Sequence, residues 1–435
     1  MNKNKNLKWG VAISAVQTEG AYKKDGKSLS IWDTFTQKRY KIKDRSNARI
    51  ATDFYHRYKE DIDLAVTIGL QIFRFSVSWS RILPDGIGEV NPKGIDFYNK
   101  VIDYCLEAGI EPWITTYHWD LPQKLQNKGG WCNREVINWY ITYVTVLRDN
   151  YADKVKKWIL INEGIVCIGG GYFLGVHAPG KRGIDSFISG VHHILLAQAE
   201  GFRVLKEKEG LEVGTALSCT KVEPYRNTKA DKKAANRIDT LMNRLFIEPH
   251  LGMGYPDTDL PILKRIAKYY KEEDLETLKV DFDFWGIQTY TRQVVRSAWY
   301  IPYLGVMQVK PEKRNAETSV MGWETYPEGT QYFLERFSKY NPKKPLWLSE
   351  CGMALSDKED DQKRIDYYKK VIHSTQNVIR KGINVKGILL WTLVDNFEWA
   401  EGYIPKFGII SLDRNTLQRQ MKKSAIWLKK YLSAY

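Results

Sequence analysis

The stretch 53-DFYHRYKEDIDLAVTIGLQIFRFSVS-78 contains the pattern that decides the fold. Its apolar residues recur at helical spacing and are predicted to share one face of a helix: Phe54, Tyr58, Ile62 and Val66. Gly69 is expected to end that helix, and the run from Gln71 to Ser78 is typical of a buried strand. A helix followed at once by a buried strand is the repeating unit of a parallel α/β sheet.

The same unit recurs along the chain. A helical pattern that starts at Gly94 stops at Gly109, and another that ends at Gly382 is also followed by a strand-like run. Eight strand-like runs are predicted, near residues Trp9–Val16, Gln71–Ser78, Pro112–His118, Trp158–Asn162, Val213–Ser218, Phe282–Tyr290, Leu346–Ser349 and Gly387–Leu393. Eight such units with no Ser/Pro/Gly-rich linker between them predict a closed (β/α)8 barrel, the TIM barrel, as a single domain over residues 1–435. The residues beyond a minimal barrel are expected in long βα loops at its C-terminal face.

Composition agrees with one large folded protein. The chain has 435 residues, of which 43% are hydrophobic and 27% charged, which is far from the signature of disorder. At about 150 residues per domain this length suggests about three domains, but single α/β barrels are a known exception.

The net charge of +15, from 66 Lys plus Arg against 51 Asp plus Glu, first suggests a nucleic-acid partner. The basic residues, however, recur in separate stretches: 38–49, 203–208, 229–237 and 419–430. This spread favours a solvated surface, and we predict no nucleic-acid partner. Recruitment to nucleic acid stays open as an alternative that would need these residues on one face of the molecule.

The cysteines indicate a reducing compartment. The five cysteines, Cys105, Cys132, Cys167, Cys219 and Cys351, form no Cys-x-x-Cys pair and lie in hydrophobic segments, which favours reduced thiols and a cytoplasmic location.

No membrane or export segment is predicted. The longest apolar runs, such as 387–394, are shorter than the ~18 to 20 residues of a membrane helix. Lys3, Lys5 and Lys8 precede an apolar run at 11–16, but this run is short for a signal peptide and no small-residue cleavage site follows it.

Polar and aromatic residues lie where the predicted strands end: Arg74, His118, Glu163, Tyr290, Glu350 and Trp391. The C-terminal ends of barrel strands meet at one mouth, so we expect these side chains to converge there. Glu163 and Glu350 each follow an apolar strand, where a carboxylate is costly to bury unless it is paired or functional. Two carboxylates that face one mouth are typical of glycoside hydrolysis, although each alone could be a structural ion-pair partner.

Other catalytic motifs are absent or incomplete. The stretch Asp25–Ser28 resembles a phosphate loop, but Ala21 stands where that motif needs its first glycine. The glycines 169–171 lack a dinucleotide fingerprint, and the seven histidines include no His-Glu-x-x-His. We predict no metal and no cofactor.

The chain resembles family 1 of the glycoside hydrolases, the retaining β-glycosidases typified by β-glucosidases. The resemblance runs from Trp9 to about Trp427. The matching stretches are 17-QTEGA-21, 32-WDTF-35, 55-YHRYKEDI-62, 73-FRFSVSW-79, 117-YHWDLP-122, 162-NE-163, 177-HAPG-180, 326-YPEG-329 and 395-DNFEWA-400.

This resemblance implies roles for individual residues. Glu163 matches the general acid/base and Glu350 the nucleophile, while Arg74 and Tyr290 match residues that contact the nucleophile. In a retaining site the two carboxyl groups lie about 5 to 5.5 Å apart, and one of them attacks the sugar directly.

The resemblance also implies a sugar-binding set. Its members are Gln17, His118, Trp119, Asn162, Trp323, Trp391, Glu398, Trp399 and Phe407. Within it, Trp391 matches the apolar platform for the sugar ring, Trp323 flanks the aglycone side and Phe407 lies near C6 of the sugar. Glu398 favours unphosphorylated substrates, because a carboxylate there would repel a 6-phosphate.

The sequence departs from the usual family pattern in four places. Gly164 follows the acid/base where proline is usual, and Cys351 follows the nucleophile where asparagine is usual. Val16 replaces a common aromatic residue, and 286-GIQTY-290 replaces the usual Asn-Tyr-Tyr. Cys351 could be a reactive thiol or a packed one.

The sequence therefore predicts a retaining exo-β-glycosidase that acts through a covalent glycosyl-enzyme. The expected partner is a small-molecule substrate, an unphosphorylated β-glucoside or a short β-linked oligosaccharide. The alternative is a catalytically weak or silent sugar-binding relative of the same fold. The presence of both Glu163 and Glu350 favours the enzyme.

Overall fold

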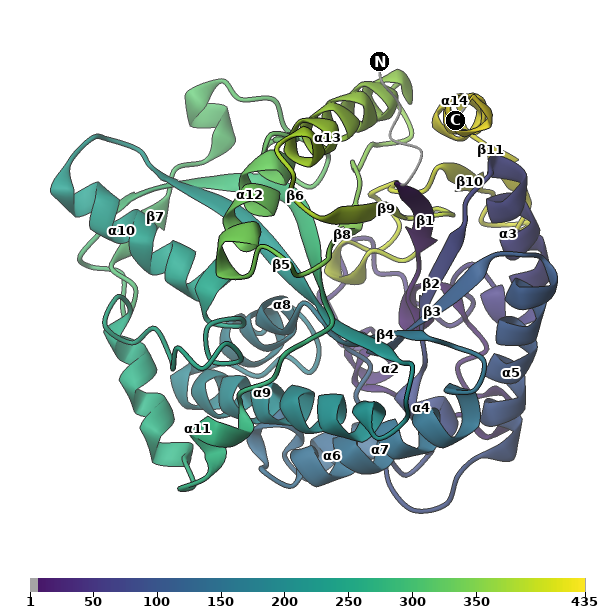
Figure 1. Cartoon of the computed structure of the whole chain (residues 1–435), viewed down its shortest axis with the longest axis horizontal. Coiled ribbons are helices and arrows are strands. Elements are labelled where there is room, and N and C mark those ends of the chain that lie inside the picture. Colours follow the sequence, from purple (N-terminus) through teal and green to yellow (C-terminus); the bar gives the residue numbers. More distant parts are fainter. Residues whose placement is uncertain (1–6, 435) are drawn as a thin grey trace.

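Eight parallel strands close into a barrel in the computed structural model, which describes residues 7–434 (Figure 1). These strands are β1 (Lys8–Ala12), β2 (Ile72–Ser76), β3 (Glu111–Tyr117), β4 (Lys157–Asn162), β5 (Glu212–Pro224), β6 (Phe284–Ser297), β8 (Leu346–Cys351) and β9 (Val385–Trp391). Their order is β5-β4-β3-β2-β1-β9-β8-β6, and pairing of β5 with β6 closes the ring. The predicted (β/α)8 barrel and all of its predicted strands are confirmed.

Helices surround the strands (Figure 1). The longer ones are α3 (Phe54–Ile68), α5 (Pro92–Glu107), α7 (Val136–Tyr151), α9 (Ile184–Lys206), α10 (Lys229–Asp239), α12 (Gly329–Tyr340), α13 (Gln362–Arg380) and α14 (Lys423–Ser433). Short helices are α1 (Ala15–Thr18), α2 (Ile31–Phe35), α4 (Trp79–Ile82), α6 (Gln123–Asn127), α8 (Gly164–Ile168) and α11 (Asp274–Thr277). Short 3-10 and π segments are η1 (Lys24–Gly26), η2 (Gly130–Cys132), η3 (Gly169–Leu174), η4 (Thr240–Arg244), η5 (Pro261–Tyr269), η6 (Pro311–Arg314) and η7 (Trp399–Glu401). Among residues 7–434, no helix has the length and apolar character needed to cross a membrane.

Helix α3 follows the predicted pattern at its start and drifts at its end. Phe54 and Ile62 are buried as expected, but Val66 is 37% exposed while Ala65 and Ile68 are buried. Residues spaced by four rotate about 40° further around the helix at each step, so the apolar face passes from Val66 to Ala65. Gly69 ends the helix at φ 94°, as its predicted role requires.

Three strands end more than two residues away from the positions that the sequence predicts. β1 stops at Ala12 rather than Val16, because the chain turns into α1, where the Ala15 N–H donates to Ser76 Oγ at 2.7 Å. β5 and β6 instead run past the barrel rim, and they stay paired as far as Pro224 and Val295. The short strand β7 (Val306–Gln308) pairs antiparallel with this extension of β6, and β10 (Ile410–Leu412) pairs with β11 (Arg419–Met421).

The apolar run at residues 11–16 spans the end of β1 and the start of α1. Val11 is fully buried in β1, which pairs with β2 and β9. Lys3 and Lys5 of that stretch lie outside the described residues.

Side chains fill the N-terminal end of the barrel. One layer combines a buried residue from each of seven strands: Ile72, Trp113, Ile159, Ala216, Phe284, Trp347 and Leu389. The Lys157 ammonium caps this layer, 4.9 Å from the ring centre of Trp347 and 5.0 Å from that of Trp113, and pairs with Glu212 at 2.9 Å. The barrel is therefore a packed core at this end, which leaves the opposite end for a site.

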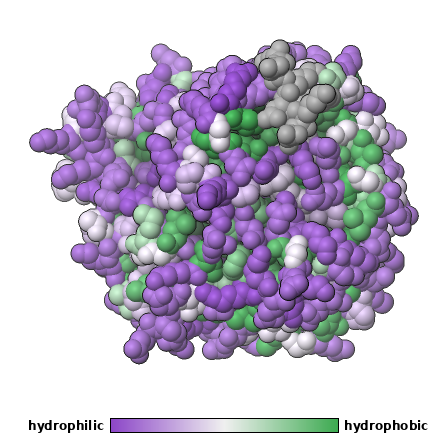
Figure 2. Space-filling model, viewed as in Figure 1, coloured by the Kyte–Doolittle hydropathy of each residue, from purple (hydrophilic) through white to green (hydrophobic). Residues whose placement is uncertain are grey.

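The exterior is mostly hydrophilic on the face shown in Figure 2, with apolar residues in scattered patches. Basic helices do not gather at one place, since α10 and α14 lie on opposite sides of the barrel (Figure 1).

Trp113→Ala should lower the free energy of unfolding by about 3–5 kcal/mol, measured by urea denaturation. The buried indole packs 4.6 Å from the ring of Trp347 and 5.7 Å from that of Phe284, so its removal leaves a cavity in the barrel. The matched control is Trp299→Ala, because Trp299 is 89% exposed and its removal should change stability by less than about 0.5 kcal/mol. Equal effects of the two substitutions would contradict this description of the core.

Candidate active site

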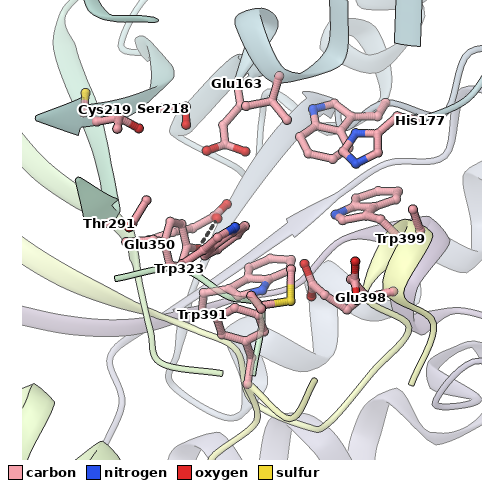
Figure 3. Close-up of a pocket in the computed structure, with 18 of the residues that line it drawn as sticks. Glu163, His177, Ser218, Cys219, Thr291, Trp323, Glu350, Trp391, Glu398 and Trp399 are labelled. Atoms are coloured by element: carbon pink, nitrogen blue, oxygen red, sulfur yellow. Dashed lines mark hydrogen bonds between the residues drawn. The ribbon is translucent and has the colours of Figure 1, made fainter. Parts of the chain in front are cut away.

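The strand ends singled out in the sequence converge on one cavity of about 350 Å³ at the C-terminal end of the barrel (Figure 3). Most of the predicted site residues line it: His118, Trp119, Glu163, Tyr290, Trp323, Glu350, Trp391, Glu398, Trp399 and Phe407. The other three, Gln17, Arg74 and Asn162, are buried directly behind the wall, and each hydrogen-bonds to a residue that lines it. The structure thus brings the whole predicted set together.

Glu350 lies at the end of β8 between a cation and a phenol. Arg74 Nη1 donates to Glu350 Oε1 at 2.8 Å, and the Tyr290 hydroxyl donates to Oε2 at 2.8 Å. Burial raises the pKa of Glu350, while both partners stabilise its ionised form and oppose that rise.

Arg74 is buried, and all three nitrogens of its guanidinium donate hydrogen bonds. Besides Glu350, it donates to Thr115 Oγ1 at 2.9 Å, to the Ser349 carbonyl at 3.0 Å and to Asn162 Oδ1 at 2.6 Å. These contacts connect β2 with β3, β4 and β8 and fix the orientation of Glu350.

Glu163 directly follows β4 and has left-handed backbone angles, φ 46° and ψ 58°. This conformation is uncommon for a residue with a side chain and is typical of constrained sites. In Figure 3 the carboxyl groups of Glu163 and Glu350 point into the same cavity. Burial first, and then the negative charge of Glu350, raise the pKa of Glu163 to about 8, against the opposing effects of Ser218 and Arg74.

The two carboxyl groups therefore differ in environment. Glu350 has a direct guanidinium partner and a phenol donor, whereas Glu163 has only the Ser218 hydroxyl and a more distant Arg74 charge. As the pH rises, Glu350 should lose its proton before Glu163 does, and Glu163 should keep its proton near neutral pH.

His118 and Asn162 are hydrogen-bonded to each other, and both side chains are uncharged. Asn162 Oδ1 accepts from Arg74 and from Gln288 Nε2, the latter at 2.8 Å, so its amide nitrogen donates to His118 Nε2 at 3.0 Å. This assigns the imidazole proton to Nδ1, which has no hydrogen-bond partner among residues 7–434. Burial and the charge of Arg74 lower the pKa of His118, so the ring is neutral and offers one N–H to a ligand.

Glu398 and Gln17 form a second polar group on the wall. Gln17 Nε2 donates to the Phe397 carbonyl at 2.9 Å and to Glu398 Oε2 at 3.3 Å, and Ser14 Oγ donates to Gln17 Oε1 at 2.6 Å. Burial raises the pKa of Glu398 to about 8, and the charges of Glu350 and Glu163 add to this effect. Among the described residues, three buried carboxyl groups, those of Glu163, Glu350 and Glu398, therefore face the cavity of a chain of net positive charge.

Aromatic rings form the remaining walls. Trp391 and Trp399 lie 5.8 and 5.9 Å from the His118 ring at small interplanar angles, and Trp119 is 4.4 Å from Trp399. Trp323 and Phe407 pack near Tyr290 on another side. Flat apolar walls between hydrogen-bonding groups are suited to a pyranose ring.

The sequence profile described as "Glycosyl hydrolase family 1" matches residues 3–434. The chain belongs to glycosyl hydrolase family 1. It is 40% identical over 429 residues to a 1,4-beta-D-glucan glucohydrolase of Thermotoga neapolitana, with 96% of this chain and 95% of the relative covered. It is 39% identical to Beta-glucosidase A of Thermotoga maritima, at the same coverage. A solved family 1 β-glucosidase from Thermotoga maritima superimposes with a TM-score of 0.93 at 37% identity, over 99% of this chain and 98% of that one.

This family 1 glycoside hydrolase has further cavity residues that the sequence analysis did not single out as site residues. They are Val166, His177, Ser218, Cys219, Thr220, Met242, Thr291, Gln293, Met321, Ala400 and Glu401. Ser218 ends a predicted strand and Thr291 follows another, so the strand-end rule could have found both. Met242 and Met321 lie outside the barrel strands, and their positions in the sequence carry no such signal.

The structure shows the local surroundings of three of the four family departures. A Cβ at Gly164 would lie 2.4 Å from Phe246 Cε1, so glycine after the acid/base position makes room for this ring. Gln288, in the departing stretch 286–290, donates to Asn162 at 2.8 Å. Cys351 is fully buried, and burial raises the pKa of its thiol far above the ordinary range, which favours the packed thiol over the reactive one.

Tyr290→Phe should move the acid limb of kcat/KM to higher pH, because it removes a hydrogen bond that stabilises ionised Glu350 and leaves the burial unchanged. At pH values on this acid limb, kcat/KM should fall about tenfold. The control is Tyr367→Phe, which removes another buried hydroxyl, one that donates to the Thr289 carbonyl at 3.3 Å and not to a carboxylate. A limb that does not move in Tyr290→Phe would mean that this contact does not tune Glu350.

Proposed function

We propose that the protein is a retaining exo-β-glucosidase that hydrolyses unphosphorylated β-glucosides or short β-linked oligosaccharides. Glu350 is the nucleophile and Glu163 the general acid/base. One observation supports these roles above all: Glu163 and Glu350 are buried and face one cavity, and of these two only Glu350 is paired with a guanidinium. Paired carboxyl groups with opposite protonation are what the retaining mechanism requires.

In the first step Glu350 attacks the anomeric carbon of the bound glucoside. A bond forms between the carboxylate oxygen and this carbon while the bond to the leaving-group oxygen breaks. Glu163 gives its proton to that oxygen, so that the leaving group departs as a neutral alcohol. Arg74 and Tyr290 hold Glu350 ionised and oriented for the attack.

In the second step water releases the sugar. Once Glu350 is esterified its negative charge is gone, so the pKa of Glu163 falls and Glu163 can stay ionised. Glu163 takes a proton from the incoming water, whose oxygen bonds to the anomeric carbon as the ester bond breaks. Glu350 leaves as a carboxylate and both groups return to their starting states.

Sugar binding is assigned to the remaining residues of the predicted set. The ring hydroxyls are assigned to the lining residues His118, Glu398 and Trp399, together with Gln17 and Asn162 directly behind the wall. Trp391 is the platform, Phe407 lies near C6, Trp119 supports this pocket and Trp323 contacts the leaving group. The unpartnered His118 Nδ1–H is one such donor. Glu398 supports an unphosphorylated substrate, because its carboxyl group would repel a 6-phosphate. The names of the Thermotoga relatives support glucose as the sugar.

We also propose that residues 1–435 form one catalytic domain that works in the cytoplasm. All five cysteines are free, which fits a reducing compartment. That the basic surface binds no nucleic acid stays a prediction, which the separation of α10 and α14 supports. The sugar-binding alternative lacks a specific observation in its favour, since the chain accommodates the departures at Gly164 and Cys351.

Glu350→Gly should reduce hydrolysis of 4-nitrophenyl β-glucoside by a factor on the order of 10⁴ or more. Azide should restore turnover and give an α-glucosyl azide, because the small anion attacks from the side that the carboxylate has vacated. Glu163→Ala should slow release of the glucosyl-enzyme about 10²- to 10⁴-fold, with a β-glucosyl azide formed when azide is added. The control is Glu209→Gly, at an exposed acid in a turn. Wild-type turnover in either site variant would reject its assigned role.

The pH dependence of kcat/KM should be bell-shaped, with a basic limb near the pKa of Glu163, about 8. Activity is lost as pH rises through this value, because deprotonated Glu163 cannot donate to the leaving group. With 2,4-dinitrophenyl β-glucoside, whose leaving group needs no proton, Glu163→Ala should lose the basic limb while the acid limb of Glu350 remains. A basic limb that persists in this variant would assign it to another group.

A further inference from the structure

The wall that carries Trp323 is a hairpin over residues 317–325. The Ser319 N–H donates to the Trp323 carbonyl at 2.8 Å, and the Thr325 N–H donates to the Glu317 carbonyl at 2.9 Å. Gly322 has φ +70° in the turn, and Met321 and Trp323 on either side of it line the cavity. The side chains of Met321 and Trp323 therefore depend on how this hairpin is anchored.

Glu324 anchors the hairpin through two guanidinium groups. Its carboxylate is buried, and Oε1 accepts from Arg292 Nε at 2.7 Å. Oε2 accepts from Arg314, which ends the short segment η6 before the hairpin. Both cations lower the pKa of Glu324 against the opposing effect of burial, so this carboxylate stays ionised at neutral pH.

Arg292 ties this carboxylate to the extension of the barrel. It lies on the part of β6 that passes the rim, where it pairs in register with Lys221 of β5. Its Nη1 donates to Glu223 Oε2 at 2.6 Å, and its guanidinium lies 4.7 Å from the centre of the Tyr326 ring. Lys221 completes the group, since its ammonium lies 2.8 Å from Glu223 and donates to the Tyr326 hydroxyl at 3.0 Å.

These charged side chains lie beside the cavity and do not line it. On β6 the neighbours Thr291 and Gln293 line the cavity, whereas Arg292 does not. A small void of about 10 Å³ lies behind the hairpin, lined by Trp323, Thr325 and Met353 among others, so packing there is incomplete. The charge-assisted hydrogen bonds of Glu324 thus hold the backbone next to Trp323, while the Trp323 ring packs against Tyr290 and Phe407.

We propose that Arg292 and Glu324 are positioning residues for the leaving-group side of the cavity. Their ion pair holds Trp323 and Met321 in place and so determines how well the enzyme accepts bulky leaving groups. This inference rests on the proposed function, in which Trp323 contacts the leaving group. If this inference holds, loss of the ion pair lowers kcat/KM more for larger leaving groups. Recognition of the glucosyl part of the substrate stays unchanged.

The test compares wild type with Arg292→Gln and Glu324→Gln on methyl β-glucoside, 4-nitrophenyl β-glucoside and cellobiose. Both variants should lose about tenfold or more in kcat/KM on the two bulky substrates, mainly through KM, and less than about twofold on methyl β-glucoside. Inhibition by glucose, which occupies only the sugar part of the cavity, should change less than about twofold. Arg292→Lys keeps the positive charge but loses the forked guanidinium that reaches both Glu324 and Glu223. Its kcat/KM on the bulky substrates should therefore lie between those of wild type and Arg292→Gln.

The matched control is Arg296→Gln. Arg296 is an exposed arginine of the same strand, and its guanidinium contacts only Met307 Sδ among side chains of the described residues. This variant should match wild type on every substrate.

Each outcome decides between the proposals. An equal loss on all three substrates, or no loss on any, overturns the positioning role. Failure of both glutamine variants to fold, shown by circular dichroism and melting temperature, also overturns it, because the pair would then serve general stability. A wild-type enzyme that cleaves none of the three substrates would instead reject the proposed function.

Discussion

The buried guanidinium of Arg74 is the constraint on which the site depends. Burying the Arg74 charge or the Glu350 charge without a partner would cost several kcal/mol of folding free energy. Each of the two groups offsets that cost for the other by pairing with it. The remaining donors of Arg74 reach Thr115, Asn162 and the Ser349 carbonyl, which places β2, β3, β4 and β8 in a single register at their C-terminal ends. Because Asn162 Oδ1 is occupied by Arg74, its amide nitrogen must turn to His118. One cation therefore orients both the proposed nucleophile and part of the proposed sugar-binding wall.

The sequence was sufficient for the parts of the molecule that follow from periodicity. Alternation of helical and strand patterns predicted the barrel, and the rule that strand ends share one mouth brought Arg74, Glu163 and Glu350 together without any contact being known. Burial of a carboxylate after an apolar strand was a strong signal because its cost is large and local. The resemblance added residues such as Gln17 and Glu398, which no strand pattern could have placed.

The sequence could not predict what depends on contacts between distant segments. The Phe246 ring leaves no room for a side chain at position 164, which accounts for the glycine there. The two residues meet because α8 and the chain after η4 pack against each other, and the local sequence does not show this. The runs that form β5 and β6 gave no sign that both strands continue past the rim, since their outer parts are polar and alternate irregularly. Met242 reaches the cavity from η4 and Met321 from the hairpin over residues 317–325, and the positions of both segments follow from packing rather than from local propensity.

Strand β6 connects the chemistry to the cavity wall. Tyr290 donates to Glu350, Thr291 and Gln293 line the cavity, and Arg292 binds the carboxylate of Glu324 in the Trp323 hairpin. Inside the barrel, Arg74 of β2, the strand across the barrel from β6, also donates to Glu350. The orientation of Glu350 therefore does not depend on Tyr290 alone. Beyond the rim, paired strands and ion pairs hold the wall together with the packing of Met321 and Trp323 beside Phe407. Sequence changes in this outer part can therefore reshape the leaving-group side without displacing the reacting carboxylates, which separates substrate selection from catalysis within one strand.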